Sequence, residues 1–300
     1  DAAAVADIAV GPLPATPIMR WLCERGGPVG RFSQSLLLRS PSGLRQEDLA
    51  VALQALLDHH DALRLRLDAG GGAPASEHQA FQSSGPKDWT FEVLPSGSVR
   101  APSCLRRVDA DDLDEDELRS LIHQEAEAAE LRLDPAAGHL VQAVWFDAGA
   151  AREGRLLLTI HHFAVDGVSW RILGPDLAAA WRAVSGGRAV SLPPRSTSFR
   201  TWAQQLSARA RDAALAPEVS FWRDMLGGPS LLLSDGRLDA SRDVTGTAGH
   251  LTLTLPASVT EALLTRVPAA FHGGINDVLL SALVLAVADW CRRRTQGAAG

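Results

Sequence analysis

Strand-like and helix-like patterns of apolar positions alternate along the chain, and the clearest switch between them lies near its middle. Residues 156–160 form an apolar run typical of a buried β-strand. Between 170 and 181 the apolar side chains recur three and four positions apart, which predicts an amphipathic helix. Residues 140–146 predict a further strand, which we expect to neighbour 156–160 in one sheet. The segment 161–169 should therefore connect a core strand to a helix.

The rest of the pattern predicts helices and strands on both sides of that connection. Upstream, we expect helices at 17–22, 47–60 and 109–131, and strands at 31–38, 62–67, 78–82, 89–94 and 104–108. Downstream, we expect helices at 199–211, 218–226, 257–266 and from 275 onward, with a strand at 250–255. This succession predicts an α/β fold, a mixed sheet with flanking helices.

Glycine- and proline-rich stretches predict the domain boundaries. Residues 1–10 are alanine-rich and are expected to be a linker or tail. Residues 185–197 contain Gly-Gly and Pro-Pro pairs and form the best candidate for a linker inside the chain. We therefore expect an N-terminal lobe at 11–184 and the start of a C-terminal lobe at 198–300.

Composition narrows the function classes. The 300 residues are 46% hydrophobic and 21% charged, proportions typical of a globular chain with a sizeable core. A net charge of −6 without a basic block argues against a nucleic-acid partner. The three cysteines are far apart in the sequence, which fits a reducing compartment, so we expect a cytoplasmic protein. We expect neither a membrane span nor a signal peptide, because no apolar run reaches spanning length and no cationic start precedes one.

The residues best suited to chemistry gather where the central strand ends. His161 and His162 are adjacent there, and side chains alternate along a strand, so one imidazole should face a cavity while the other packs and holds the turn. Imidazole titrates near neutrality, which suits a general base. Asp166 could orient an imidazole or pair with a buried arginine, and its place beside Gly167 at a strand-to-helix turn predicts that it is buried. Gly167 would allow a backbone angle or a close approach that a Cβ forbids. Ser169 is expected to cap the following helix.

The histidine pair also fits two other interpretations, a metal site or ordinary turn histidines. The sequence nearby offers no third ligand at a recognisable spacing, so we expect no metal. The segment is not a hydrolase nucleophile elbow, because Arg171 stands where the second glycine belongs. Nucleotide, nicotinamide and pyridoxal signatures do not stand out in the sequence, so we expect this chain to bind no cofactor.

The same segment resembles a known family. His-His-x-x-x-Asp-Gly at 161–167 is similar to the core motif of the condensation-type domains of nonribosomal peptide synthetases, which in turn resemble chloramphenicol acetyltransferase. The extension Val-Ser-Trp-Arg-Ile-Leu at 168–173 looks like the epimerization-domain form of this motif, as does His-His-Asp-Ala-Leu-Arg-Leu-Arg-Leu at 59–67. The resemblance runs from about Gly11 to Trp290. It implies a chloramphenicol acetyltransferase-like fold, with a complete first lobe and the beginning of a similar second one.

The resemblance also implies roles for single residues in the histidine segment. His162 would be the catalytic base, because the second histidine of the motif faces the reaction centre in that family. His161, Asp166 and Gly167 would complete the active loop around it.

Further residues are implied to support the site through structure. Arg64 would pair with Asp166 and fix the loop, with Ser169 and Trp170 in support. The alternation of residues 62–67 leaves a second interpretation equally open, in which Arg64 is simply on the solvated face of a strand.

By this resemblance the chain is expected to invert, from L to D, the α-carbon of an aminoacyl or peptidyl thioester. The substrate would arrive on the 4′-phosphopantetheine arm of a peptidyl carrier protein domain, upstream in the same polypeptide and beside other synthetase domains. The alternatives are a condensation domain that forms peptide bonds and a non-catalytic fragment that binds a carrier protein. The family's later motifs, including Glu-Gly-His-Gly-Arg, are absent from these 300 residues. We therefore expect an incomplete second lobe that lacks the second catalytic residue, and no efficient epimerization by this segment alone.

Overall fold

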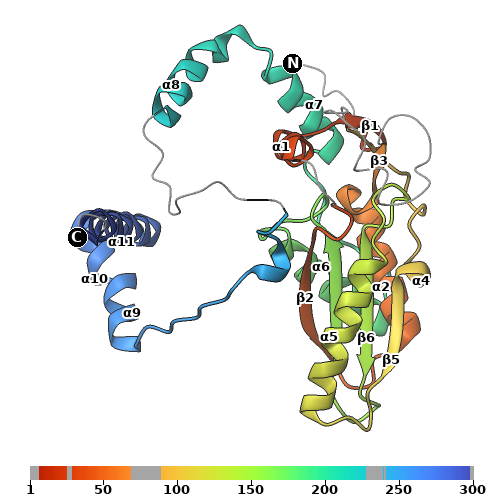
Figure 1. Ribbon diagram of the computed structural model, residues 1–300. Helices are drawn as coiled ribbons and strands as arrows, with labels where there is room; N and C mark the ends of the chain where they lie inside the picture. Colours follow the sequence, from red (N-terminus) through yellow and green to blue (C-terminus); the bar gives the residue numbers. More distant parts are fainter. Residues whose placement is uncertain (1–6, 26–28, 69–88, 228–238, 240, 298–300) are drawn as a thin grey trace. The chain divides into compact units, whose positions relative to one another are not determined.

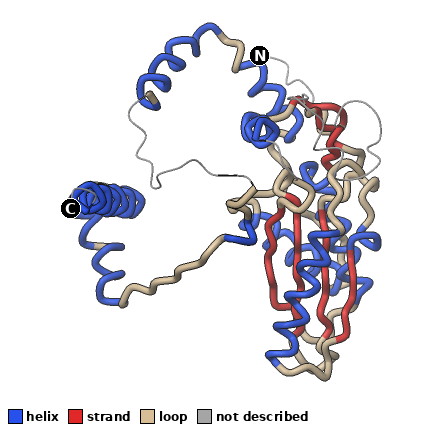
Figure 2. The backbone as a smooth tube through the Cα atoms, in the orientation of Figure 1, coloured by secondary structure: helices blue, strands red, loops and turns tan. Residues whose placement is uncertain are grey.

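The computed structural model describes residues 7–25, 29–68, 89–227, 239 and 241–297, so the strand expected at 78–82 lies outside the described residues. The chain divides into two compact units, one ending at Ala216 and the other beginning at Pro217. The first unit contains both β-sheets, and the described part of the second contains helices and loops (Figure 2).

The larger sheet has four strands in the order β2-β7-β6-β5. They are β2 (Ser33–Ser40), β5 (Leu105–Asp109), β6 (Val141–Asp147) and β7 (Gly154–His161). β2 and β6 run antiparallel to β7, whereas β5 runs parallel to β6, so the sheet is mixed. The expected pairing of the two central apolar strands is confirmed, with Val141 opposite Ile160.

Helices cover both faces of this sheet. They are α2 (Gln46–His59), α5 (Glu115–Leu131) and α6 (Trp170–Ser185). Leu156, Leu158 and Ile160 of β7 belong to the core shared with α2 and α6, whereas Leu157 packs with α5 on the other face. α5 crosses the near face of the sheet in Figure 1. Burial on both faces explains why β7 reads as a continuous apolar run.

The smaller sheet has three antiparallel strands in the order β1-β4-β3, namely β1 (Gly11–Pro14), β3 (Leu65–Asp68) and β4 (Thr90–Val93). The strand expected at 62–67 is shorter than predicted, because Asp61–Arg64 forms a 3-10 turn and the extended backbone begins only at Leu65. Within β3 the predicted alternation holds: Leu65 and Leu67 are buried and Arg66 is exposed.

The first unit extends beyond the two sheets to Ala216. It also includes α1 (Pro17–Arg25), α4 (Ala101–Cys104), α7 (Phe199–Arg209) and a 3-10 turn at Ala213–Leu215. Asp7 accepts hydrogen bonds from the amide and the hydroxyl of Ser198 at 2.6 and 2.5 Å. Arg200 donates to the carbonyl of Pro12 at 3.0 Å. These contacts join the N-terminal segment and the start of α7 to the small sheet within the first unit.

The second unit is helical in its described part. Its helices are α8 (Ala216–Leu226, whose first residue belongs to the first unit), α9 (Ala257–Leu264), α10 (Arg266–Phe271) and α11 (Ile275–Gly297), with a 3-10 turn at Thr245–Thr247. The helix expected at 257–266 ends at Leu264, because the ring of Pro268 conflicts with the carbonyl four residues earlier. The strand expected at 250–255 is wrong: that segment pairs with no described strand, and Leu251 is 85% exposed.

Among the described residues, no single helix has both the length and the apolar composition needed to cross a bilayer. Residues Ala257–Phe271 and Ile275–Arg294 satisfy both requirements only as a pair of segments bent by 97°.

Candidate active site

His161 ends β7 and lies inside the core, with none of its surface exposed. Its Nε2 lies 2.8 Å from the carbonyl oxygen of Val29, and its Nδ1 accepts the amide of Phe163 at 3.1 Å. A carbonyl oxygen can only accept, so Nε2 carries the proton and Nδ1 the lone pair. Burial lowers the pKa of His161 to about 4. This histidine is thus a neutral structural group that holds the start of the loop.

His162 has a different environment, as the alternation argument predicted. It is half-buried, and its backbone amide donates to the carbonyl of Phe32 at 2.7 Å. Its imidazole stacks on the ring of Phe32, with centroids 4.7 Å apart and planes 19° from parallel. Its Nε2 lies 3.1 Å from the side-chain nitrogen of Gln34. These two residues of the segment around β2 fix the imidazole in one orientation.

A chain of two hydrogen bonds determines which nitrogen of neutral His162 carries the proton. The indole N–H of Trp170 lies 2.9 Å from Oε1 of Gln34. Indole can only donate, so the oxygen of the Gln34 amide faces Trp170 and its NH₂ group faces His162. That NH₂ group donates to Nε2, which leaves the ring proton on Nδ1. The lone pair available to accept a proton is therefore on Nε2.

Asp166 is exposed, so the expectation that it is buried is wrong. Its carboxylate accepts the amides of Val168 and Ser169 at 3.0 and 2.8 Å, and the hydroxyl of Ser169 at 2.7 Å. The hydrogen bonds from Ser169 hold the pKa of Asp166 below its ordinary value. Asp166 therefore ties together the turn that leads into α6. Ser169 was expected to cap that helix, but its hydroxyl bonds to Asp166 instead.

Within the protein itself, Gly167 is required neither for a left-handed backbone angle nor for a close contact. Its φ lies outside the left-handed region, and a Cβ built on it would meet no protein atom within 4 Å. The backbone there is accessible to any residue, and the space beside it is open.

The expected pair between Arg64 and Asp166 is wrong. The guanidinium of Arg64 donates to the carbonyls of Leu57, Asp58 and Leu94, at 2.5, 2.8 and 3.0 Å. Arg64 is only 1% exposed, so the interpretation as a solvated strand residue is wrong as well. Backbone carbonyls at the end of α2 have no partner within the helix, and Arg64 supplies donors to two of them. It holds the 3-10 turn against α2 and β4.

The sequence interpretation missed Phe32 and Gln34 as members of the site. Both lie in the strand expected at 31–38, and the register of Gln34 opposite Ile160 of β7 brings it beside the histidine loop. Strand pairing was the signal that could have found both residues. β7 ends in the histidine loop, so residues of the strand paired with it lie at the same end of the sheet.

Taken together, the half-buried imidazole, its fixed lone pair and the ordered turn can act as a general base on a substrate that reaches Nε2. A proton taken up on Nε2 would replace the hydrogen bond from Gln34. The Gln34 amide must therefore move away from Nε2 when His162 acts as a base.

A family model described as the condensation domain matches residues 28–298. The chain belongs to this condensation-domain family. A linear gramicidin synthase protein of Brevibacillus parabrevis is 36% identical over 291 residues, which is 96% of this chain and 4% of that protein. Surfactin synthase subunit 2 of Bacillus subtilis (strain 168) is 32% identical over 278 residues, 92% of this chain and 7% of that protein. The chain thus spans a small part of these relatives.

Solved structures confirm the expected fold class. The epimerization domain from the third module of tyrocidine synthetase B superposes with a TM-score of 0.77 at 28% identity, covering 96% of this chain and 61% of that one. The first condensation domain of the calcium-dependent antibiotic synthetase superposes with a TM-score of 0.63 at 18% identity, covering 92% of this chain and 60% of that one. The chain has the mixed α/β condensation-domain fold, chloramphenicol acetyltransferase-like, over roughly one lobe and part of another.

Proposed function

We propose that this member of the condensation-domain family is an epimerization domain. It inverts the α-carbon of an aminoacyl or peptidyl thioester presented on the phosphopantetheine arm of a carrier protein domain in the same synthetase. The observation that carries the proposal is the likeness to a solved epimerization domain over 96% of the chain. The Val-Ser-Trp-Arg-Ile-Leu extension at 168–173 supports it, because Trp170 of that string orders the amide beside His162.

His162 is the base in this proposal. Its Nε2 takes the α-proton of the thioester, and the electron pair of the broken C–H bond moves into the thioester carbonyl to form an enolate. Inversion is complete when a second group returns a proton to carbon on the opposite face. The chain binds no cofactor for this step, because the thioester itself acidifies the α-carbon. His161 and Asp166 act through position, one inside the core and one within the turn.

Condensation is the second candidate, and the description of the matching family model favours it. In that reaction His162 would assist the attack of an amine on the thioester of a carrier-bound donor. The amine nitrogen would form the new C–N bond, the C–S bond would break, and the imidazole would pass the proton lost by nitrogen to the departing thiolate, while the α-carbon stays untouched.

The test uses the full-length polypeptide that contains these residues, with its own carrier domain loaded with an L-aminoacyl thioester. The reaction is run in deuterated water, with and without a downstream acceptor aminoacyl carrier. Epimerization predicts deuterium at the α-carbon and conversion toward the D-form without any acceptor. A new amide that forms only with the acceptor, and without α-label, would replace our proposal by condensation. If neither product forms, the result would indicate a carrier-binding module and would also contradict our proposal.

A further inference from the structure

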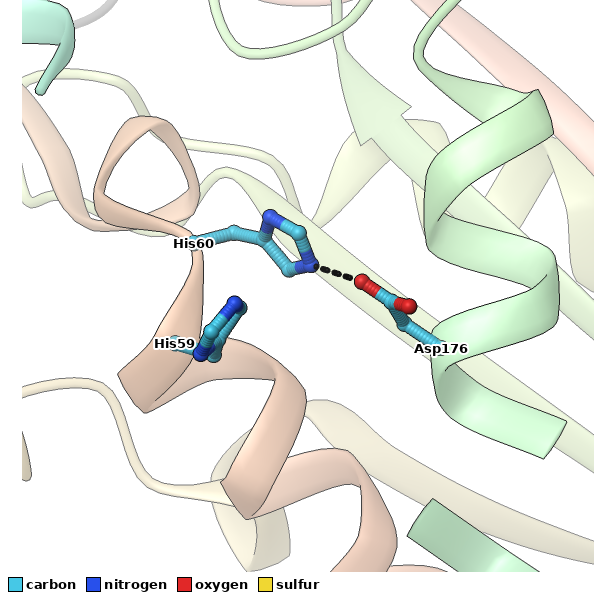
Figure 3. A group of neighbouring side chains, drawn as sticks. All are labelled: His59, His60 and Asp176. Carbon is cyan, nitrogen blue, oxygen red and sulfur yellow. Dashed lines mark hydrogen bonds and ion pairs between the residues drawn. The ribbon is translucent and has the colours of Figure 1, made fainter. Parts of the chain in front are cut away.

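Three side chains with metal-ligand chemistry meet between α2 and α6, apart from the histidine loop (Figure 3). His59 is the last residue of α2 and His60 follows it, whereas Asp176 comes from α6. Nε2 of His60 lies 2.9 Å from a carboxylate oxygen of Asp176. One potential ligand atom from each of the three residues lies within 4.8 Å of the others. Residues far apart in sequence thus form one compact set of donors.

The donor set matches a transition-metal ion better than a hard cation. Two imidazoles and one carboxylate suit zinc, which binds histidine nitrogen and carboxylate oxygen at about 2.0–2.2 Å. Calcium and magnesium select sites built from oxygen ligands. In a tetrahedral zinc site neighbouring ligands are about 3.4 Å apart, since each lies about 2.1 Å from the ion. The observed spread of up to 4.8 Å is larger than such a site by at most about 1.4 Å. Rotation of the imidazole rings can supply this difference.

The surroundings of these side chains also favour a bound cation. The side chains of His60 and Asp176 are only 20% and 14% exposed, so water competes weakly for their atoms. The two imidazole rings meet edge to face, with centroids 4.9 Å apart, so neither ring blocks the other's nitrogen atoms by stacking. Asp61 adds a further negative charge near His60. Leu53 and Leu57 of α2 and Leu173 of α6 belong to one apolar core.

We propose that His59, His60 and Asp176 bind one zinc-type divalent ion. The ion ties the end of α2 to the second turn of α6 and leaves a fourth position for water. The sequence predicted no metal site. Asp176 is 116 residues away from His60, so the sequence did not show that the two side chains are neighbours. α6 begins directly after the histidine loop, so an ion at its second turn would brace the helix that follows the loop.

The experiment titrates zinc into the purified chain after a chelator has stripped it, in competition with a chromophoric indicator. We expect one tight site in the unaltered chain. His60→Gln and Asp176→Asn should each weaken zinc binding by about 100-fold. His123→Gln replaces an exposed histidine on α5 and should leave the affinity unchanged, which excludes adventitious binding by surface imidazoles. Cobalt substitution provides a second readout, because a tetrahedral site with nitrogen and oxygen ligands absorbs visible light strongly.

His59→Gln protects the test against misfolding. His59 stands outside the hydrogen bond between His60 and Asp176, so its replacement should keep the apo fold, as circular dichroism would check, and still weaken zinc binding. An unaltered chain that binds zinc no more tightly than the His60→Gln and Asp176→Asn variants would overturn the proposal. So would a single tight site that survives in all three variants. Because none of these readouts uses catalysis, the result is independent of the proposed epimerase activity.

Discussion

His161 should make the folded chain less stable as the pH falls. It is fully buried, and both ring nitrogens are committed, Nε2–H to the carbonyl of Val29 and the Nδ1 lone pair to the amide of Phe163. A second proton would have to enter on Nδ1, where it would point at the Phe163 N–H. Burial therefore lowers the pKa of the folded-state imidazole to about 4, whereas an unfolded chain keeps the ordinary histidine value of about 6.5.

The sign and the size of the effect follow from these two pKa values. Between them the unfolded chain binds the proton and the folded chain does not, so protonation favours unfolding. The stability associated with neutral His161 is thus complete above about pH 6.5 and is lost as the pH falls toward about 4. The full loss is about 3 kcal/mol, and about 2 kcal/mol of it should be lost by about pH 5.

The measurement is urea unfolding at about pH 8 and about pH 5, comparing the unaltered chain with His161→Gln. Glutamine keeps a donor for Val29 but has no group that titrates in this range. Its stability should therefore change with pH by about 2 kcal/mol less than that of the unaltered chain. His123→Gln, at an exposed site on α5, should behave like the unaltered chain. An identical pH dependence in His161→Gln and the unaltered chain would show that His161 does not titrate as its burial requires.

Three further predictions concern the residues around the loop. Asp166→Ala removes the acceptor of two turn amides and should lower the unfolding free energy by about 1 kcal/mol, whereas Asp166→Asn should retain most of that stability. Thermal unfolding measures both variants, and an unchanged melting temperature in the alanine variant would contradict the role of Asp166 in the turn. Trp170→Phe should release the Gln34 amide, mix the two tautomers of His162 in ¹⁵N NMR spectra and lower turnover about five-fold; a single retained tautomer would count against the hydrogen-bond chain. Arg64→Met leaves three carbonyls without their donor and should cost about 3 kcal/mol or more in chemical unfolding; a loss under about 1 kcal/mol would refute this assignment.

The sequence predicted the parts of the fold that depend on local pattern. The apolar run of β7, the helix that follows residue 169 and the different environments of His161 and His162 all appear in the structure. Each follows from the periodicity of neighbouring side chains, which the sequence displays directly.

Contacts between distant residues were predicted poorly, and for physical reasons. Arg64 was assigned a carboxylate partner because the family resemblance implied a pair with Asp166, but its actual acceptors are backbone carbonyls, which every residue carries. The contact between Gln34 and Trp170 joins residues 136 positions apart, and only strand pairing brings them together. Asp166 was expected to be buried because it lies at a strand-to-helix turn, whereas it is exposed and accepts the amides of that turn.

The proposed role of His162 as the base that removes the α-proton can be tested by the rate of exchange at that carbon. The polypeptide carrying these residues is loaded with an L-aminoacyl thioester in deuterated water. The rate of deuterium entry at the α-carbon is then compared among the unaltered protein, His162→Ala and the control His123→Gln, which replaces the exposed histidine on α5. We expect a fall of about 10²-fold or more for His162→Ala, with the fold intact and the control unchanged. Exchange at the unaltered rate in His162→Ala would contradict it.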